Sequence, residues 1–398
     1  MTGNLFYNPF IHYHCIKFSV MMKLYYILFV TISVLLVSCS DNEEPKKEIK
    51  QEQSAKIEIK KDSVSFNIDF YPEKSIIVDS NLVLLGKDET GNYRMFAVNI
   101  KSGKANDEFL KTFYDREIAK LTVKNDTVIG FFESERTWGY WNNKWNKYQL
   151  TNDWVFNGKY GVLNYLLEDN TYIVYSLDYG EFGGEVYFYN KKTDRLYGMK
   201  LYGPVLCVKD KDGYIVNGSL PHNTGFVEIL KIKKPETLIE IPDSFNIIKY
   251  SELKSSFVFI EKQENEFLPD SLEEKIRNPQ KFDVNAYQMS KQIIKNKLRV
   301  ETILDTTDML CYATIPVKGK YLHIFQKRKK VNAGIVEGAG MNVIDSLYDE
   351  SLFSYDFSSR LYKNVYLISF SYWQQKIRKE KMICLVWRDE KLTRYNFN

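Results

Sequence analysis

The chain has 398 residues, enough for one large all-β domain or two ordinary domains. Hydrophobic residues make up 44% of it and charged residues 27%, as in globular proteins, and the 29 tyrosines and 25 phenylalanines favour β-strands. The 55 basic residues nearly balance 51 acidic ones along the chain, which argues against the concentrated basic face that a nucleic-acid-binding protein needs.

The first segment has the pattern of an export signal. Residues 1–20 are rich in aromatic side chains and nearly uncharged, unlike the basic start of a signal peptide, so we expect translation to begin at Met21 or Met22. Lys23 and the apolar run from Leu24 to Val37 then form the signal itself. This run is shorter than the about twenty apolar residues of a stable transmembrane helix. Residues 1–38 are therefore assigned to the signal-peptide segment, with residues 1–20 interpreted as an upstream start artefact.

The four residues Leu36-Val37-Ser38-Cys39 end this run. They resemble the lipobox of bacterial lipoproteins, and the resemblance covers only the first tenth of the chain. It implies cleavage before Cys39 and palmitate-type acyl chains on its thiol, which would anchor the protein to a membrane. Ser40 follows, instead of the aspartate associated with inner-membrane retention, so we expect an outer-membrane lipoprotein on the periplasmic side or at the cell surface. The alternative is an ordinary secretory peptide with an incidental cysteine.

The residues after the cysteine predict a linker. Residues 39–61 are dominated by Glu, Lys, Gln and Asp, with too few large apolar side chains to form a core. We expect a disordered charged tether over 39–61 and a folded domain over 62–398.

Turn signals repeat along the predicted domain. Polar turns interrupt the apolar runs at spacings of about 42 to 46 residues, apart from one of about 64, which is the period of propeller blades. These turns lie near Ser80, Asp126, Asn170, Asp212, Ser255, Gly319 and Asn364. A second set of turns follows five of these seven by about 17 to 25 residues, so the repeating unit is expected to have two hairpins in series, as in a four-stranded blade.

The sequence therefore predicts an all-β fold, a β-propeller of about seven four-stranded blades, with six blades as the alternative and a pair of β-sandwiches as the third choice. The long interval coincides with a change of composition, and we expect a short helical insertion over 262–297 in the fifth blade. The opening strand from Ser63 to Phe70 is expected to pair with the last blade. The resemblance to propeller lipoproteins is one of spacing only.

Motifs for catalysis are missing from the sequence. It has no His-Glu-x-x-His, Gly-x-Ser-x-Gly, phosphate-binding glycine loop or Cys-x-x-Cys, and it predicts neither a metal nor a cofactor. Glycosidase chemistry needs only two carboxylates, which no spacing reveals; loop-flanking candidates are Glu133, Glu135, Asp178 and Glu181. Cys207, Cys311 and Cys384 lie in apolar runs and are expected to be buried, although one disulfide among them is conceivable.

The irregular connections between second and third strands should carry any binding site, because variable loops on a rigid scaffold usually do. These connections include the insertion and residues 327–338. We expect the following residues to surround a central depression on one face: Arg136, Trp138, Tyr179, Glu181, His222, Asn223 and Trp373. The sequence favours a non-catalytic envelope platform that binds a glycan, a peptide or a partner protein. An extracellular polysaccharide hydrolase or lyase is the alternative.

Overall fold

The computed structural model describes residues 57–398 except 115–117, 119, 125–126, 132–136, 148–162, 179–182, 222–224, 243–254, 278–282, 339, 350–355 and 375–378. The chain divides into two units, Met1–Ala55 and Lys56–Asn398, and every element below belongs to the second. That unit starts ahead of the boundary expected at residue 62, because Ile57 and Ile59 are already buried in its core.

Six sheets make up the domain, each with at least four strands. The first contains β2 (Tyr71–Val78), β3 (Asn81–Lys87), β4 (Tyr93–Asn99) and β5 (Lys104–Ala105). The second contains β6 (Lys120–Lys124), β7 (Thr127–Phe131), β8 (Thr137–Trp141) and β9 (Lys144–Lys147). The third contains β10 (Leu163–Glu168), β11 (Tyr172–Asp178), β12 (Gly184–Asn190), β13 (Arg195–Leu201) and β17 (Ile239–Ile241).

The remaining three sheets follow the same plan. The fourth contains β14 (Pro204–Asp210), β15 (Gly213–Leu220), β16 (Phe226–Ile232) and β18 (Val300–Thr307). The fifth contains β19 (Met309–Val317), β20 (Lys320–Lys327), β21 (Lys330–Glu337) and β22 (Gly340–Tyr348). The sixth contains β23 (Asp356–Tyr362), β24 (Val365–Gln374), β25 (Lys379–Arg388), β26 (Lys391–Phe397) and β1 (Lys60–Phe66).

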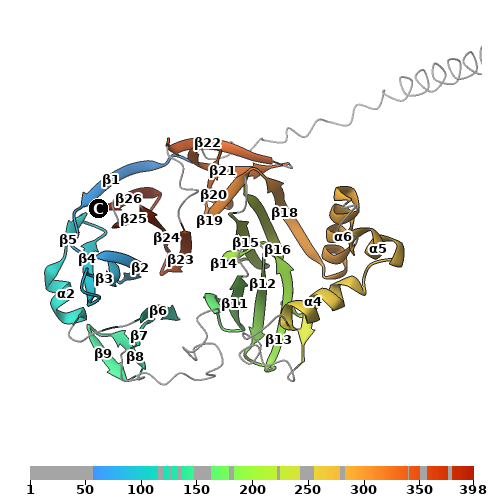
Figure 1. Cartoon of the computed structure of the whole chain (residues 1–398), viewed down its shortest axis with the longest axis horizontal. Coiled ribbons are helices and arrows are strands. Elements are labelled where there is room, and N and C mark those ends of the chain that lie inside the picture. The colour runs from blue at the N-terminus through green and yellow to red at the C-terminus, as the bar shows by residue number, and fades with distance from the viewer. Residues whose placement is uncertain are drawn as a thin grey trace, which may run out of the picture. The chain divides into compact units, whose positions relative to one another are not determined.

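The sheets form a closed ring (Figure 1). Their first long strands, β2, β6, β10, β14, β19 and β23, contact one another in that order, and β2 also contacts β24 of the sixth sheet. Hydrophobic clusters join the first sheet to the second and the sixth, the third to the fourth, and the fourth, fifth and sixth to one another, which is the packing of propeller blades. The fold is therefore a six-bladed β-propeller, as the alternative prediction had it, and the count of seven is wrong.

The extra blade came from one misread turn. Ser255 begins helix α4 (Ser255–Asn265), not a hairpin, whereas the other predicted turns join the first two strands of a blade. Several tight turns contain non-glycine residues with positive φ, a backbone conformation that Asn and Asp tolerate best. They include Asp79, Asn142, Asn143, Asp194, Asn364 and Asp389.

The opening strand β1 pairs with β26, in parallel, as the fifth strand of the sixth blade. Its register runs from Lys60 opposite Lys391 to Phe66 opposite Phe397. The expected pairing of the first strand with the last blade is confirmed. Because the sixth blade already has four strands of its own, β1 covers its outer edge and does not complete it.

An inserted segment separates β16 from β18, the third and fourth strands of the fourth blade. It contains the short helix η4 (Pro235–Thr237), strand β17, and helices α4, α5 (Asp270–Arg277) and α6 (Val284–Lys297). The predicted range 262–297 starts too late, and its assignment to a fifth blade is wrong because the misread turn at Ser255 shifted the count. Strand β17 pairs with β13, so the segment bridges the third and fourth blades.

Two further features belong to the core. Helix α2 (Asp107–Phe113) follows the first blade, and the carbonyl oxygen of Phe113 accepts a hydrogen bond of 2.7 Å from the indole of Trp145. Cys207, Cys311 and Cys384 are buried free thiols, which confirms their expected role as small apolar residues.

No helix in the described part of the chain is both long and apolar enough to span a bilayer.

Candidate binding pocket

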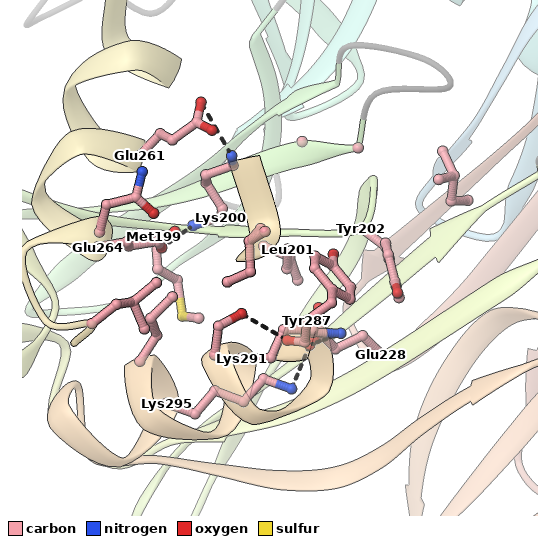
Figure 2. Close-up of a pocket in the computed structure, with 18 residues that line it drawn as sticks. Met199, Lys200, Leu201, Tyr202, Glu228, Glu261, Glu264, Tyr287, Lys291 and Lys295 are labelled. Carbon is pink, nitrogen blue, oxygen red and sulfur yellow. Dashed lines mark hydrogen bonds and ion pairs between the residues drawn. The ribbon is translucent and has the colours of Figure 1, made fainter. Parts of the chain in front are cut away.

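A pocket of about 330 Å³ lies between the inserted helices and the outer strands of the third and fourth blades (Figure 2). Its apolar lining comes from both the blades and the helices. The lining side chains used below are Met199, Leu201, Leu268 and Ile294. The volume is at the lower end of the range of about 300–1,000 Å³ for small-molecule sites.

Helix α4 approaches the sheet closely because Gly198 has no side chain. A Cβ atom at this position would lie 2.9 Å from the ring of Tyr187 and 3.2 Å from the terminal methyl group of Ile260. Ile260 itself is fully buried. The contact fixes α4 across β13 and places Glu261, the next residue, and Glu264, one turn further along, beside Lys200 (Figure 2).

Helix α6 supplies the opposite side of the pocket. Its N-terminus is capped by Asp283, whose carboxylate accepts hydrogen bonds from the backbone N–H groups of Asn285 and Ala286 at 2.9 and 3.1 Å. Lys291 and Lys295 are four residues apart and therefore lie on one face of the helix. That face turns toward the blade.

These two lysines form a buried network with Glu228 of β16 and Asp305 of β18. The ammonium of Lys295 lies 2.5 Å from Glu228 and 3.2 Å from Asp305, and that of Lys291 lies 3.1 Å and 2.7 Å from the same carboxylates. Burial disfavours the charge on Lys291, but the two carboxylates outweigh burial and raise its pKa. The same lysines lower the pKa of Asp305 against the opposing effect of its burial.

Aromatic rings complete this side. The ammonium of Lys291 lies 4.6 Å from the ring centre of Tyr202 and 6.0 Å from that of Tyr287, within cation–π range. Burial raises the pKa of Tyr202 to about 12, so its hydroxyl stays protonated at neutral pH and can donate a hydrogen bond.

Glu264 differs from the other acidic groups. Its side chain is 7% exposed and lines the pocket, and one carboxyl oxygen accepts a hydrogen bond of 3.2 Å from the backbone N–H of Lys200. Burial, reinforced by the charges of Glu185 and Glu228, raises its pKa to about 7 despite the opposing effect of Lys200. A carboxyl group with such a pKa can either accept or donate a proton near neutral pH.

Of the site residues expected from the sequence, the structure describes the side chain of Trp138 alone. Trp138 is on β8, half-buried and packed against the core between the first and second blades. Arg136, Tyr179, Glu181, His222 and Asn223 lie outside the described residues, and Trp373 lies on β24 with its side chain outside the described part. Their grouping around a central depression stays a prediction.

The structure contradicts two of the expected connections between second and third strands. Residues 327–338 are mostly strand β21, preceded by a tight turn, and the insertion joins third and fourth strands of a blade instead of second and third. Gly183 and Gly184 line the pocket, and Gly183 has a φ of +90°.

The pocket residues themselves were missed by sequence reasoning. Glu264 and Lys200 are far apart in the chain and belong to segments that look like ordinary amphipathic structure. The one local signal was the capped helix with lysines at Lys291 and Lys295. No cluster of His, Cys, Asp and Glu able to hold a metal ion occurs among the residues with defined positions.

Comparisons with known proteins add a distant likeness. No family model and no curated protein matches the chain. The acylaminoacyl peptidase of Pyrococcus horikoshii matches at 7% identity over 81% of this chain and 45% of its own, with a TM-score of 0.33. The propeller domain of the Trilobed protease of Pyrococcus furiosus matches at 10% identity over 83% and 98%, with a TM-score of 0.31.

A third similar structure is a Trypanosoma rangeli sialidase, at 9% identity over 81% of this chain and 53% of its own, with a TM-score of 0.32. The chain thus spans about half the length of the peptidase and of the sialidase. At these TM-scores the likenesses carry no conclusion about activity, so the function has to be argued from the site.

Proposed function

We propose that this chain is an outer-membrane lipoprotein whose propeller is a platform for ligand binding, with the ligand held under the inserted helices. The observation that carries the binding role is the pocket of about 330 Å³, which exists because of the insertion. The fourth blade is complete without the helices, because β16 and β18 pair directly along their whole length. The segment therefore adds a site to a finished scaffold.

The ligand is a glycan, a peptide or a segment of a partner protein. Tyrosine rings and acidic side chains at the pocket suit sugars as well as peptide side chains. Binding of either kind is tested by screening the purified full-length chain in detergent on glycan and peptide arrays.

A pocket variant gives that screen its specificity. Asn265 lines the pocket, so Asn265→Trp should fill it and reduce binding of any array hit at least tenfold. Lys262→Trp, on the exposed side of the same helix, should leave binding unchanged. Equal binding by the two variants would remove the ligand from this pocket.

Attachment to the membrane rests on the lipobox and is tested separately. In cells, Cys39→Ala should abolish acylation and stop cleavage of the precursor at its normal position. Palmitate labelling and fractionation of the outer membrane measure both effects. Continued labelling of the variant would rule out the lipoprotein assignment and leave the pocket assignment intact.

Catalysis is the second candidate, and the raised pKa of Glu264 favours it, because a protonated carboxyl group can act as a general acid. The reaction would be cleavage of an extracellular polysaccharide, either by hydrolysis or by the elimination that a lyase catalyses. Incubation of array-positive glycans with the protein, followed by product analysis, tests this role. Shortened products that disappear with Glu264→Gln would support it, whereas intact glycans would leave binding alone.

A further inference from the structure

Among the buried carboxyl groups that line the pocket, Glu264 forms no ion pair with any residue that the structure describes. Glu228 has two lysine ammonium groups within 3.1 Å, whereas the described residues offer Glu264 one hydrogen bond, from the backbone of Lys200. Its side chain is nevertheless more than nine-tenths buried and faces the pocket. Burying a carboxylate without a positive partner is unfavourable, so the pocket has room for a ligand that supplies a positive charge to Glu264.

The nearby lysines already form ion pairs with other carboxylates. The ammonium of Lys200 lies 3.6 Å from Glu261, and Lys291 and Lys295 share Glu228 and Asp305. Three carboxyl groups and three lysines line the cavity, and each lysine already forms an ion pair with a carboxylate other than Glu264. The charged and titratable groups that face Glu264 from the elements packed around it are Glu185 of β12, Lys200 of β13, Glu228 of β16, Glu261 of its own helix, and Tyr287, Lys291 and Lys295 of α6.

The rest of the lining suits an aliphatic chain. Met199 and Leu201 of β13 and Leu268 and Ile294 of the helices form apolar walls next to the carboxyl group. A lysine side chain places four methylene groups on apolar surface and an ammonium at its tip. Its shape and charge match a cavity with apolar walls and one unpaired acid.

We infer that the pocket binds a lysine side chain presented by a peptide, with the Glu264 carboxylate as the counter-charge of its ammonium group. The inference rests on the proposed platform function and specifies the ligand class. The bound ammonium would ionise Glu264, so binding releases a proton below a pH of about 7. The ligand itself stays charged, because a free lysine has a pKa of about 10.4.

The test uses two probes, Nα-acetyl-lysine N-methylamide and its neutral analogue, Nα-acetyl-norleucine N-methylamide, titrated calorimetrically into the full-length chain. At pH 8 the lysine probe should bind at least tenfold more tightly than the norleucine probe. At pH 6 about nine-tenths of Glu264 is protonated, so affinity for the lysine probe should fall about tenfold. The proton release should appear as a dependence of the heat on the buffer.

Variants complete the test. Glu264→Gln should lose both the preference for lysine and the pH dependence, while Glu274→Gln, at an exposed position of α5 outside the pocket lining, should keep both. Circular dichroism checks that the variants are folded. A lysine probe that binds Glu264→Gln and wild type alike would overturn the assignment.

The remaining outcomes separate this inference from the platform function. Equal affinity for the two probes would show an apolar site, which refutes the amine ligand and supports binding in the pocket. If neither probe binds at either pH, the lysine inference is wrong, and the array comparison of Asn265→Trp with Lys262→Trp still decides the platform function.

Discussion

Glu264 makes the folded state less stable as the pH rises. Its pKa is about 7 in the folded protein against an ordinary value of 4.5, because burial disfavours its ionised form. Between these values the folded state binds more protons than the unfolded state, so the free energy of unfolding falls as pH increases through this window. The full effect is about 3 kcal/mol.

Glu264→Gln keeps the shape of the side chain but cannot ionise. We therefore expect the variant to gain stability relative to wild type as the pH rises from 5 to 8, by up to about 3 kcal/mol. Urea unfolding at pH 5, 6.5 and 8 measures the difference. Glu274→Gln, at an exposed position of α5, is the control and should show no such trend. A constant difference between Glu264→Gln and wild type would contradict the assigned pKa.

His323 acts in the opposite direction. It is 1% exposed on β20, its Nδ1 lies 3.0 Å from the hydroxyl of Thr314, and burial lowers its pKa to about 4. The unfolded state binds the extra proton below its pKa of about 6.5, so stability is lost as the pH falls from there toward 4.

His323→Gln should remove up to about 3 kcal/mol of this acid-induced loss, measured as the difference between variant and wild-type unfolding free energies at pH 7 and pH 4.5. Asp88 and Asp169, whose pKa values are about 2, titrate identically in both proteins and cancel in the difference. Parallel stability curves for the two proteins would show that His323 is not the group responsible.

At the scale of elements, the inserted helices are held to the fourth blade by the network of two lysines and two carboxylates. Lys295 is 5% exposed, and Lys295→Met would leave Glu228 with Lys291 alone. Breaking one partner of a buried ion pair costs about 3–5 kcal/mol, because the remaining charge stays buried. The loss should fall mainly on α6 and leave the ring closed.

Hydrogen exchange followed by mass spectrometry checks this prediction. Peptides from residues 284–297 should exchange faster in Lys295→Met than in wild type, while peptides from β24 and β25 stay protected. Lys297→Met, an exposed position on the same helix, is the control. Replacing Glu228 by Gln as well should restore part of the protection, and uniform loss of protection across all blades would disprove a local role.

The blade hairpins could be predicted because their turns are encoded locally. The residue types of Asp212-Gly213 and Lys363-Asn364 predict turns independently of the rest of the chain. Ser255 has the same polar character but starts a helix, and nothing in the adjacent sequence distinguishes the two cases. One ambiguous turn changed the blade count and placed the insertion in the wrong blade.

At the scale of the whole molecule, the pocket could not be predicted from the sequence. It combines β13, β16, α4 and α6, whose contact depends on ring order and on the crossing of the insertion from the fourth blade to the third. Loop position alone selected Trp138, which packs into the core instead. Local sequence patterns identify strands. Whether a buried carboxyl group such as Glu264 finds an ion-pair partner depends on tertiary packing.

Closure of the ring also depends on contacts distant in sequence. Phe66 of β1 stacks on Phe397 of the sixth blade, with ring centres 5.7 Å apart, and lies 5.3 Å from Phe96 of the first blade. The opening strand therefore joins the two blades where the chain begins and ends its circuit. Phe66 is only half-buried, so its truncation should cost less than the 3–5 kcal/mol of a fully buried phenylalanine.

Phe66→Ala should lower the free energy of unfolding by about 2 kcal/mol, within a single transition, because opening the junction exposes both neighbouring blades. Guanidinium unfolding followed by tyrosine and tryptophan fluorescence and by circular dichroism measures the loss and tests whether the probes coincide. Lys60→Ala, at the exposed start of the same strand, should change stability by less than about 0.5 kcal/mol. If Phe66→Ala instead produced an early separate transition, with β1 and β26 exchanging hydrogen before the other strands, the strand would be a local edge cover, and the ring would be closed by the direct contacts between the first and sixth blades, such as those of β2 with β24 and β25.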